Sequence, residues 1–150
     1  MTQNYLDFMK KFRVEDLIIH ETKYWRWSIR PFQCTIGAGI LSLSRPAEKM
    51  LELTAEEGAD FIKMIKVIEE TLGYCFNYDK MNYIMLMMVD NHVHYHVIPR
   101  YSHPVNFAGK LYEDKFWPKP PVLDTGDLGE IELLKIKEYL KSNLVLTYKS

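Results

Sequence analysis

The stretch Asn91-His92-Val93-His94-Tyr95-His96-Val97-Ile98-Pro99-Arg100 determines how the rest of this chain is interpreted. Successive side chains of a β-strand point to opposite faces, so His92, His94 and His96 would share one face, about 7 Å apart. The residues between them are apolar or aromatic and would face a core. The pattern therefore predicts a strand that holds three imidazoles in a row.

Length and composition indicate one globular domain. The chain has 150 residues, 47% hydrophobic and 26% charged, which is enough to bury a core. A net charge of −1 gives no field that would attract nucleic acid or an anionic membrane, so we expect neither as a partner. Cys34 and Cys75 form no CxxC motif, and no apolar run has the length of a membrane span or the form of a signal peptide. We therefore expect a cytoplasmic protein.

Apolar periodicity predicts two helices before the histidines. A short amphipathic helix is expected over residues 3–13. A long one is expected over residues 55–72, because Thr54 and Glu57 before its apolar stripe fit a capping box. Gly73 is expected to end this long helix.

Five strands are predicted, in an order that suits an antiparallel sheet. Their ranges are 16–20, 24–29, 37–43, 81–89 and the histidine strand 92–100. The run 81–89 is too apolar to alternate, so we expect it to be a central strand. A tight turn at Asp90-Asn91 would join it to the histidine strand.

The last third of the chain changes character. Residues 101–126 contain several prolines and glycines with little periodicity, which predicts a long irregular segment. A helix is expected from Asp127 to about residue 142. Residues 145–148 are expected to form a short edge strand or a tail.

These elements predict an α+β fold. It would contain an antiparallel sheet of about five strands with the long helix packed on it, plus a C-terminal helix. We assign a single domain to residues 1–150, with its core at about 15–105 and the irregular segment and C-terminal helix in 106–150.

Three kinds of role are open to the histidine row. Two strand histidines at i and i+2 can bind zinc, and candidate third ligands are His20, His103, Asp90 and Cys75, none of which the spacing selects. A solvent-facing polar row is the second alternative. The third is catalysis, because neutral imidazole is a nucleophile at pH 7 and can attack phosphorus.

The segment from His92 to Arg100 resembles the His-φ-His-φ-His-φ-φ signature of the histidine-triad (HIT) superfamily, where φ is apolar. Its Pro99-Arg100 ending resembles the branch of dinucleoside polyphosphate hydrolases. Upstream, Gly37 with its strand and Arg45-Pro46-Ala47-Glu48 before the long helix are similar to the same branch. The resemblance covers roughly residues 15–105.

This resemblance implies a reaction and roles for the three histidines. His94 would be the nucleophile that takes the α-phosphate of a nucleotide, His96 would help the leaving oxygen depart, and His92 would support the site by hydrogen bonding. Water would then release the nucleotide. Members are usually homodimers, and the protein itself holds no metal or other cofactor, although a divalent cation can accompany the substrate phosphates.

The sequence departs from the family before the first histidine. The family usually has a Gly-rich loop there, whose donors hold the phosphates. Only Asp90-Asn91 is expected between the apolar strand and His92, so we predict that this loop is deleted. Arg30 stands where that branch has a ribose-binding Asn. The candidate substrate-binding residues are Arg30, Gln33, Asn91 and Arg100.

The predicted function is a nucleotide hydrolase that cleaves at the α-phosphate of a dinucleoside polyphosphate or nucleotide conjugate, through a nucleotidyl-His94 intermediate. Two alternatives stay open. One is a nucleotidylyltransferase or phosphorylase, in which phosphate or a sugar phosphate replaces water. The other is a nucleotide-binding module with little turnover.

Overall fold

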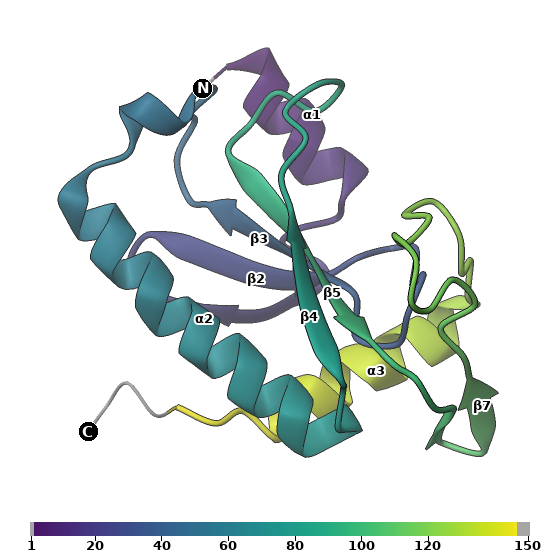
Figure 1. Ribbon diagram of the computed structural model, residues 1–150. Coiled ribbons are helices and arrows are strands. Elements are labelled where there is room, and N and C mark those ends of the chain that lie inside the picture. The colour runs from purple at the N-terminus through teal and green to yellow at the C-terminus, as the bar shows by residue number, and fades with distance from the viewer. Residues whose placement is uncertain (1, 147–150) are drawn as a thin grey trace.

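A five-stranded antiparallel sheet forms the centre of the structure, a computed structural model that describes residues 2–146 (Figure 1). The strands are β1 (Ile18–Glu21), β2 (Trp25–Ile29), β3 (Gly39–Leu43), β4 (Lys80–Ile84) and β5 (His94–Arg100). Their order in the sheet is β1-β2-β3-β5-β4, and each neighbouring pair is antiparallel. The predicted α+β fold is confirmed.

The long helix α2 (Ala55–Phe76) packs along one face of the sheet (Figure 1). Thr54 and Glu57 form the predicted capping box, in which each accepts a hydrogen bond from the other's backbone N–H, at 3.1 and 2.9 Å. The helix does not end at Gly73 as predicted. It continues for another turn because Phe76 is buried in the core, and Asn77 then ends it in the left-handed conformation, with φ 51°.

Two further helices complete the fold. Helix α1 (Gln3–Lys11) lies across the face opposite α2, where its aromatic residues meet the histidines of β5. Helix α3 (Glu130–Ser142) packs against β1 and α2, and a single 3₁₀ turn, η1 (Met50–Glu52), precedes α2. No helix within residues 2–146 is long and apolar enough to cross a membrane.

The apolar run before the histidines does not form the central strand predicted for residues 81–89. Strand β4 ends at Ile84 and lies at the edge of the sheet, beside β5. Residues 85–93 form a loop, in which Met87 has a φ of 52° that interrupts any extended conformation. Three apolar side chains of this loop are exposed to solvent: Leu86, Met88 and Val89. The predicted tight turn at Asp90-Asn91 is wrong.

The connection to β5 is therefore not shortened as the sequence suggested. A full loop is present between β4 and β5, but it contains no glycine. Its composition, rather than its length, separates it from a Gly-rich phosphate loop.

The segment after β5 is less irregular than predicted. It contains a hairpin of β6 (Val105–Phe107) and β7 (Lys110–Tyr112). Ala108 and Gly109 form its turn, both with positive φ, which the sequence reading of residues 101–126 missed. Residues 145–148 were predicted to form a short edge strand or a tail. Val145 and Leu146 are outside any strand, and residues 147 and 148 lie outside the described residues.

Candidate active site

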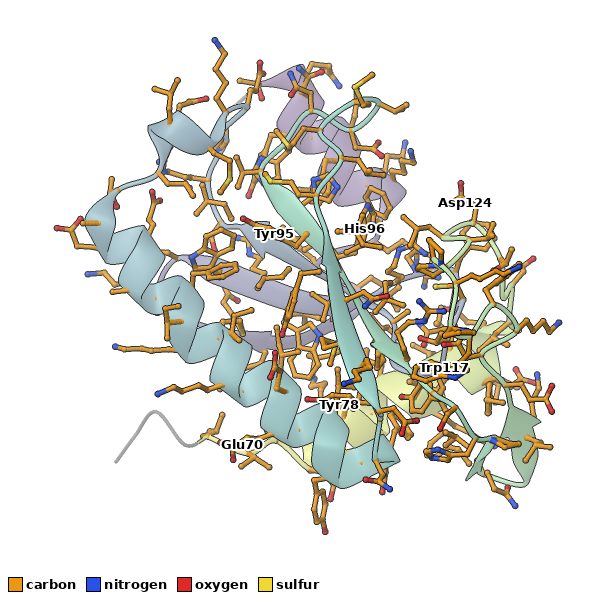
Figure 2. The ribbon with its side chains drawn as sticks, in the orientation of Figure 1. Glu70, Tyr78, Tyr95, His96, Trp117 and Asp124 are labelled. Carbon is orange, nitrogen blue, oxygen red and sulfur yellow. The ribbon has the colours of Figure 1, made fainter. Side chains whose placement is uncertain are left out.

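Strand β5 presents alternate side chains to two different surroundings, as the sequence predicted. Tyr95 faces α2, where its ring centroid lies 5.2 Å from that of Phe61. His94 and His96 face the other way, with ring centroids 5.0 Å apart and nearly perpendicular planes. Figure 2 shows Tyr95 and His96 on opposite sides of β5. The strand itself begins at His94 rather than His92.

One hydrogen bond decides which nitrogen of His94 is available for chemistry. Nδ1 lies within hydrogen-bond distance of the backbone carbonyl of His92. A carbonyl can only accept, so Nδ1 carries the proton of the neutral ring. The lone pair is then on Nε2, for which we find no hydrogen-bond partner in residues 2–146. This is the tautomer that a nucleophilic imidazole needs.

His92 acts on this site through its backbone, while its ring is engaged elsewhere. Nε2 of His92 lies 2.9 Å from the carbonyl of Leu43 in β3 and donates to it. The adjacent Val93 N–H donates to the carbonyl of Ala47 at 2.8 Å. These two bonds fix the chain just before β5 and thereby aim the His92 carbonyl at His94.

Burial keeps the three imidazoles neutral. His92 and His94 are each 1% exposed and His96 is 4% exposed. Burial is the main cause that lowers their pKa values, to about 4 for His92 and about 3 for His96, with the charge of Arg30 as the next contribution at His96. The pKa of His94 is also lowered, again mainly by burial. Unprotonated rings therefore persist well below pH 7.

Helix α1 supplies this burial, a role that the sequence reading did not assign to it. The ring of Tyr5 is 4.8 Å from that of His92, and Phe8 lies 4.9 Å from His92 and 4.7 Å from His94. Phe12 lies 5.9 Å from His96. The spacing of these aromatic residues predicted an amphipathic helix, but periodicity does not tell which face of a sheet a helix covers.

A cavity of about 250 Å³ opens beside His94 and His96. Part of the α1 end, part of the β4–β5 loop and the segment around Leu123 and Asp124 line it. Figure 2 shows Asp124 on the same side of the sheet as His96. A group bound in this cavity would therefore lie beside the two histidines.

Arg30 is the predicted substrate-binding residue that the fold brings into this cavity. Its side chain is 2% exposed and donates from Nη1 to the carbonyls of Phe32 and Leu123. Nη2 lies 3.6 Å from the carboxylate of Asp124, and Nε has no hydrogen-bond partner among the described residues. Burial lowers the pKa of Arg30. A buried guanidinium with a free donor suits an anionic ligand.

Gln33 is not directed at the cavity. Its amide donates to the carbonyls of Arg30 and Ala38, both at 2.8 Å, and its oxygen accepts from Gly37 N–H at 2.9 Å. These bonds use both donors and the acceptor of the side chain. Gln33 therefore braces the turn between β2 and β3, and we leave it out of the proposed site.

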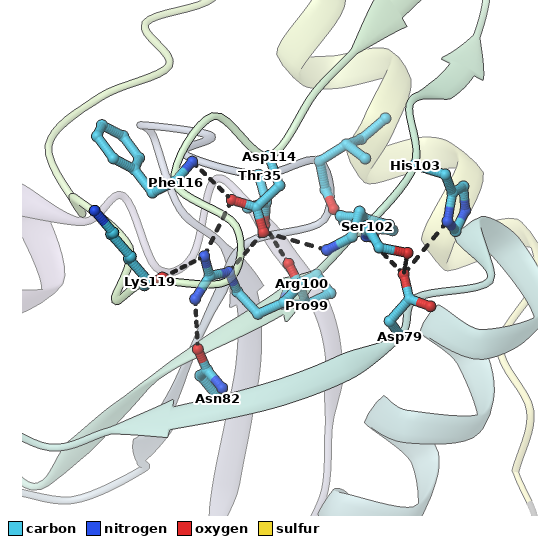
Figure 3. Close-up of polar contacts among 12 residues, drawn as sticks. Thr35, Asp79, Asn82, Pro99, Arg100, Ser102, His103, Asp114, Phe116 and Lys119 are labelled. Carbon is cyan, nitrogen blue, oxygen red and sulfur yellow. Dashed lines mark hydrogen bonds and ion pairs between the residues drawn. The ribbon is translucent and has the colours of Figure 1, made fainter.

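Arg100 lies at the far end of β5 and anchors the segment that follows (Figure 3). Its guanidinium binds the carboxylate of Asp114 through two bonds, and it also donates to Asn82 and to the carbonyl of Lys119. Arg100 and Asp114 are both buried, so the pair is structural. We leave Arg100 out of the proposed site as well.

Asn91 lies at the edge of the histidine region. Its side-chain amide is 3.4 Å from the carboxylate of Glu48, which also accepts a bond from Asn4 in α1. Asn91 does not line the cavity beside His94. The geometry thus ties the β4–β5 loop to the rest of the fold through this residue.

No metal site is evident in the part of the chain that the structure describes, where no group of three or more His, Cys, Asp and Glu could hold an ion. Of the ligands considered from sequence, His103 lies in the segment that follows β5 and is paired with Asp79 at 3.3 Å (Figure 3). Asp90 forms an ion pair with Lys11.

Comparison with known proteins gives one consistent result. Residues 41–103 match the family model of the HIT domain, whereas no curated protein matches the chain. A histidine triad protein from Sinorhizobium meliloti is similar in structure, with a TM-score of 0.68 and 21% identity over 91% of this chain and 99% of that one.

Two further solved structures have the same fold. A hypothetical histidine triad nucleotide-binding protein from Sulfolobus tokodaii has a TM-score of 0.65 and 14% identity, over 85% of this chain and 82% of that one. The diadenosine triphosphate hydrolase of Plasmodium falciparum has a TM-score of 0.64 and 14% identity, over 93% and 95%. At these identities the likeness is one of fold.

Proposed function

We propose that the chain belongs to the histidine-triad superfamily, as its HIT-domain match over residues 41–103 and its fold support, and that it is a nucleotide hydrolase acting at the α-phosphate of a dinucleoside polyphosphate or nucleotide conjugate. The observation that carries the proposal is the hydrogen bond from Nδ1 of His94 to the His92 carbonyl. It leaves the lone pair of Nε2 on a neutral, buried ring beside a cavity that also holds Arg30.

The reaction would run in two displacements. Nε2 of His94 attacks the α-phosphorus, a P–N bond forms, and the bond from phosphorus to the bridging oxygen breaks. The leaving phosphate departs with the bonding electrons, and His96 beside it offers a hydrogen bond rather than a full proton, because its pKa is lowered to about 3. Water then cleaves the P–N bond, releases the nucleoside monophosphate and restores His94.

Arg30 would stabilise the charge that develops on the oxygens of the leaving phosphate. Donors fixed before the reaction and held away from water are effective at this task, and losing one typically costs about 10²–10³-fold in kcat. In this proposal Arg30 takes over part of the work that a Gly-rich loop does elsewhere. In this proposal the reaction needs no cofactor held by the protein, and any divalent cation enters with the substrate phosphates.

We also propose that the protein acts in the cytoplasm as a homodimer, with nucleotides rather than nucleic acids or membranes as partners. The family resemblance and the net charge of −1 support this view. Light scattering after size-exclusion chromatography gives the mass in solution directly, and a monomer at micromolar concentration would contradict the dimer.

The function is tested with a panel of dinucleoside polyphosphates and nucleoside phosphoramidates. Wild-type protein is expected to release a nucleoside monophosphate from at least one of them, as measured by chromatography. His94→Ala should lose this activity by several orders of magnitude, whereas His103→Ala, outside β5 and outside the cavity lining, should keep it. Intact-mass spectrometry after rapid quenching should reveal a nucleotidyl adduct in wild type and none in His94→Ala.

Other outcomes separate the alternatives. If phosphate added to the reaction is incorporated into the nucleotide product, the protein is a phosphorylase or nucleotidylyltransferase. Nucleotide binding in calorimetry without any product or adduct identifies a binding module. Either result would overturn the hydrolase.

A further inference from the structure

The cavity beside the histidines is lined by two cations that come from distant parts of the chain. Lys11 ends α1, and Arg30 directly follows β2. Both line the cavity together with His94 and His96. Lys11 belongs to no motif that the sequence singled out, and its helix also carries the aromatic residues that cover the imidazoles.

Each of these cations is held by a carboxylate that lines the same cavity. Both oxygens of Asp90 accept from Nζ of Lys11, at 2.9 and 3.0 Å. Asp124 approaches Arg30 at 3.6 Å and is 87% exposed at its side chain. The two carboxylates therefore balance the two cations, and both lie in loops rather than on the sheet.

The pairing at Arg30 is incomplete. The Arg30 side chain is 2% exposed, yet its Nε donor has no partner among the described residues, and Asp124 contacts only Nη2, at 3.6 Å. Buried charged donors are normally satisfied, so this one points to an acceptor that the protein chain does not supply. A phosphate offers several oxygens and fits the planar fork of arginine better than one distant carboxylate.

We infer that Lys11 and Arg30 form a two-cation phosphate clamp, and that Asp90 and Asp124 hold the clamp in its empty state until substrate phosphates displace them. The clamp takes the phosphates beyond the one that His94 attacks, so it favours polyphosphate over monophosphate ligands. Its assignment to a nucleotide substrate rests on the proposed function, whereas the clamp itself requires only the cavity.

The test uses calorimetric titration of the full chain with inorganic tripolyphosphate. Lys11→Gln should weaken binding about five- to tenfold, since a charge-assisted contact is lost. Lys10→Gln is the matched control: it removes the neighbouring exposed lysine of the same helix, which does not line this cavity, and should leave the dissociation constant unchanged. Asp124→Asn should tighten binding about two- to fivefold, because the competing carboxylate is removed.

Arg30→Lys keeps the charge but loses the fork, and it should weaken tripolyphosphate binding more than Lys11→Gln does. Arg30 is buried and that variant can lose its fold, so the exposed Lys11 and Asp124 carry the test. Equal affinities for Lys11→Gln and Lys10→Gln, or weaker binding in Asp124→Asn, would overturn the clamp.

The clamp and the hydrolase fail in different ways. If tripolyphosphate binding depends on Lys11 but no nucleotide is turned over, the result supports the clamp and contradicts the hydrolase. If nucleotide is turned over and Lys11→Gln leaves KM unchanged, the result supports the hydrolase and contradicts the clamp.

Discussion

The ring centroid of Phe8 lies 4.7 Å from that of His94, so the N-terminal helix directly covers the imidazole that β5 presents. Phe8 is 1% exposed and also contacts His92 and Phe12. The same helix ends at Lys11, whose ion pair with Asp90 fastens it to the β4–β5 loop. Helix α1 therefore sets both the environment of the histidines and the entrance to them.

Replacing Phe8 by Ala should destabilise the protein by about 3–4 kcal/mol, because a buried ring is lost and a cavity remains over the histidines. Water entering that space should also raise the pKa of His94 toward its ordinary value, since burial is what lowers it. Urea unfolding and an NMR titration of the histidine ring protons measure the two effects.

Leu6→Ala on the same helix is the control for Phe8→Ala. Leu6 is 47% exposed, so its loss should cost less than about 1 kcal/mol and leave the histidine titration unchanged. Similar effects of the two variants would mean that α1 does not determine the environment of His94.

Acid should destabilise the protein in a window set by the buried histidines. The pKa of His92 is lowered to about 4 and that of His96 to about 3, against about 6.5 in an unfolded chain. Below pH 6.5 the unfolded state binds protons that the folded state does not, so the free energy of unfolding falls as pH falls. Between pH 7 and pH 5 the loss should be roughly 2 kcal/mol per histidine.

Urea unfolding of wild type at pH 7 and pH 5 measures this loss. The double variant His92→Gln/His96→Gln has fewer groups to protonate and should show a smaller difference between the two pH values. Most carboxylates titrate below this window, so they contribute little to it. Equal stability of wild type at pH 5 and pH 7 would show that the imidazoles are not held neutral by burial.

Much of this fold follows from local sequence patterns, and the parts that were not predicted depend on tertiary contacts. The alternation of His94, Tyr95 and His96 and the capping box at Thr54 depend on neighbouring residues alone, and both were predicted correctly. The run 81–89 was misread because an apolar stretch can be a central strand or an exposed loop, and only tertiary contacts distinguish them.

The site was predictable only in part, because local patterns locate the histidines but tertiary contacts form the cavity. The signature locates the histidines within one strand, whereas the cavity joins residues that are far apart in the chain. Lys11 and Asp124 carry no motif, and their proximity to His96 depends on how α1 and the segment after β7 pack on the sheet. Gln33 and Arg100 were candidate substrate-binding residues, but bonds to the backbone of residues 30–38 occupy the side chain of Gln33, and Asp114 and Asn82 occupy that of Arg100.

His92→Gln should retain most of the activity of wild type, within about tenfold. The contact that sets the tautomer of His94 comes from the backbone carbonyl of residue 92, which a substitution leaves in place. A glutamine amide N–H can also replace Nε2 of His92 as donor to the Leu43 carbonyl. kcat and KM for the best substrate of the panel measure the outcome.

His92→Leu removes that donor and leaves the Leu43 carbonyl buried without its partner, so it should lose more activity and stability than His92→Gln. If His92→Gln instead loses activity as completely as His94→Ala, the imidazole of His92 takes part in the reaction itself.

Gly126 fixes the wall of the cavity that carries Leu123 and Asp124. It has a φ of 81°, and a Cβ there would lie 1.9 Å from the carbonyl oxygen of Gln33. Its own carbonyl accepts from Gln33 N–H at 2.9 Å, so the two backbones are in direct contact. Gly126→Ala should therefore push this segment away from the β2–β3 turn and draw the Leu123 carbonyl off Arg30.

Gly109→Ala separates the cost of backbone conformation from the cost of this close contact. Gly109 has a similar φ of 78°, but nothing lies within 4 Å of a Cβ built there. Its substitution should cost about 1 kcal/mol, the usual cost of a left-handed residue with a side chain. Gly126→Ala should cost at least about 3 kcal/mol in urea unfolding and weaken nucleotide binding, because Arg30 loses its support. Equal costs for the two variants would show that the cavity wall can move away from Gln33 without consequence.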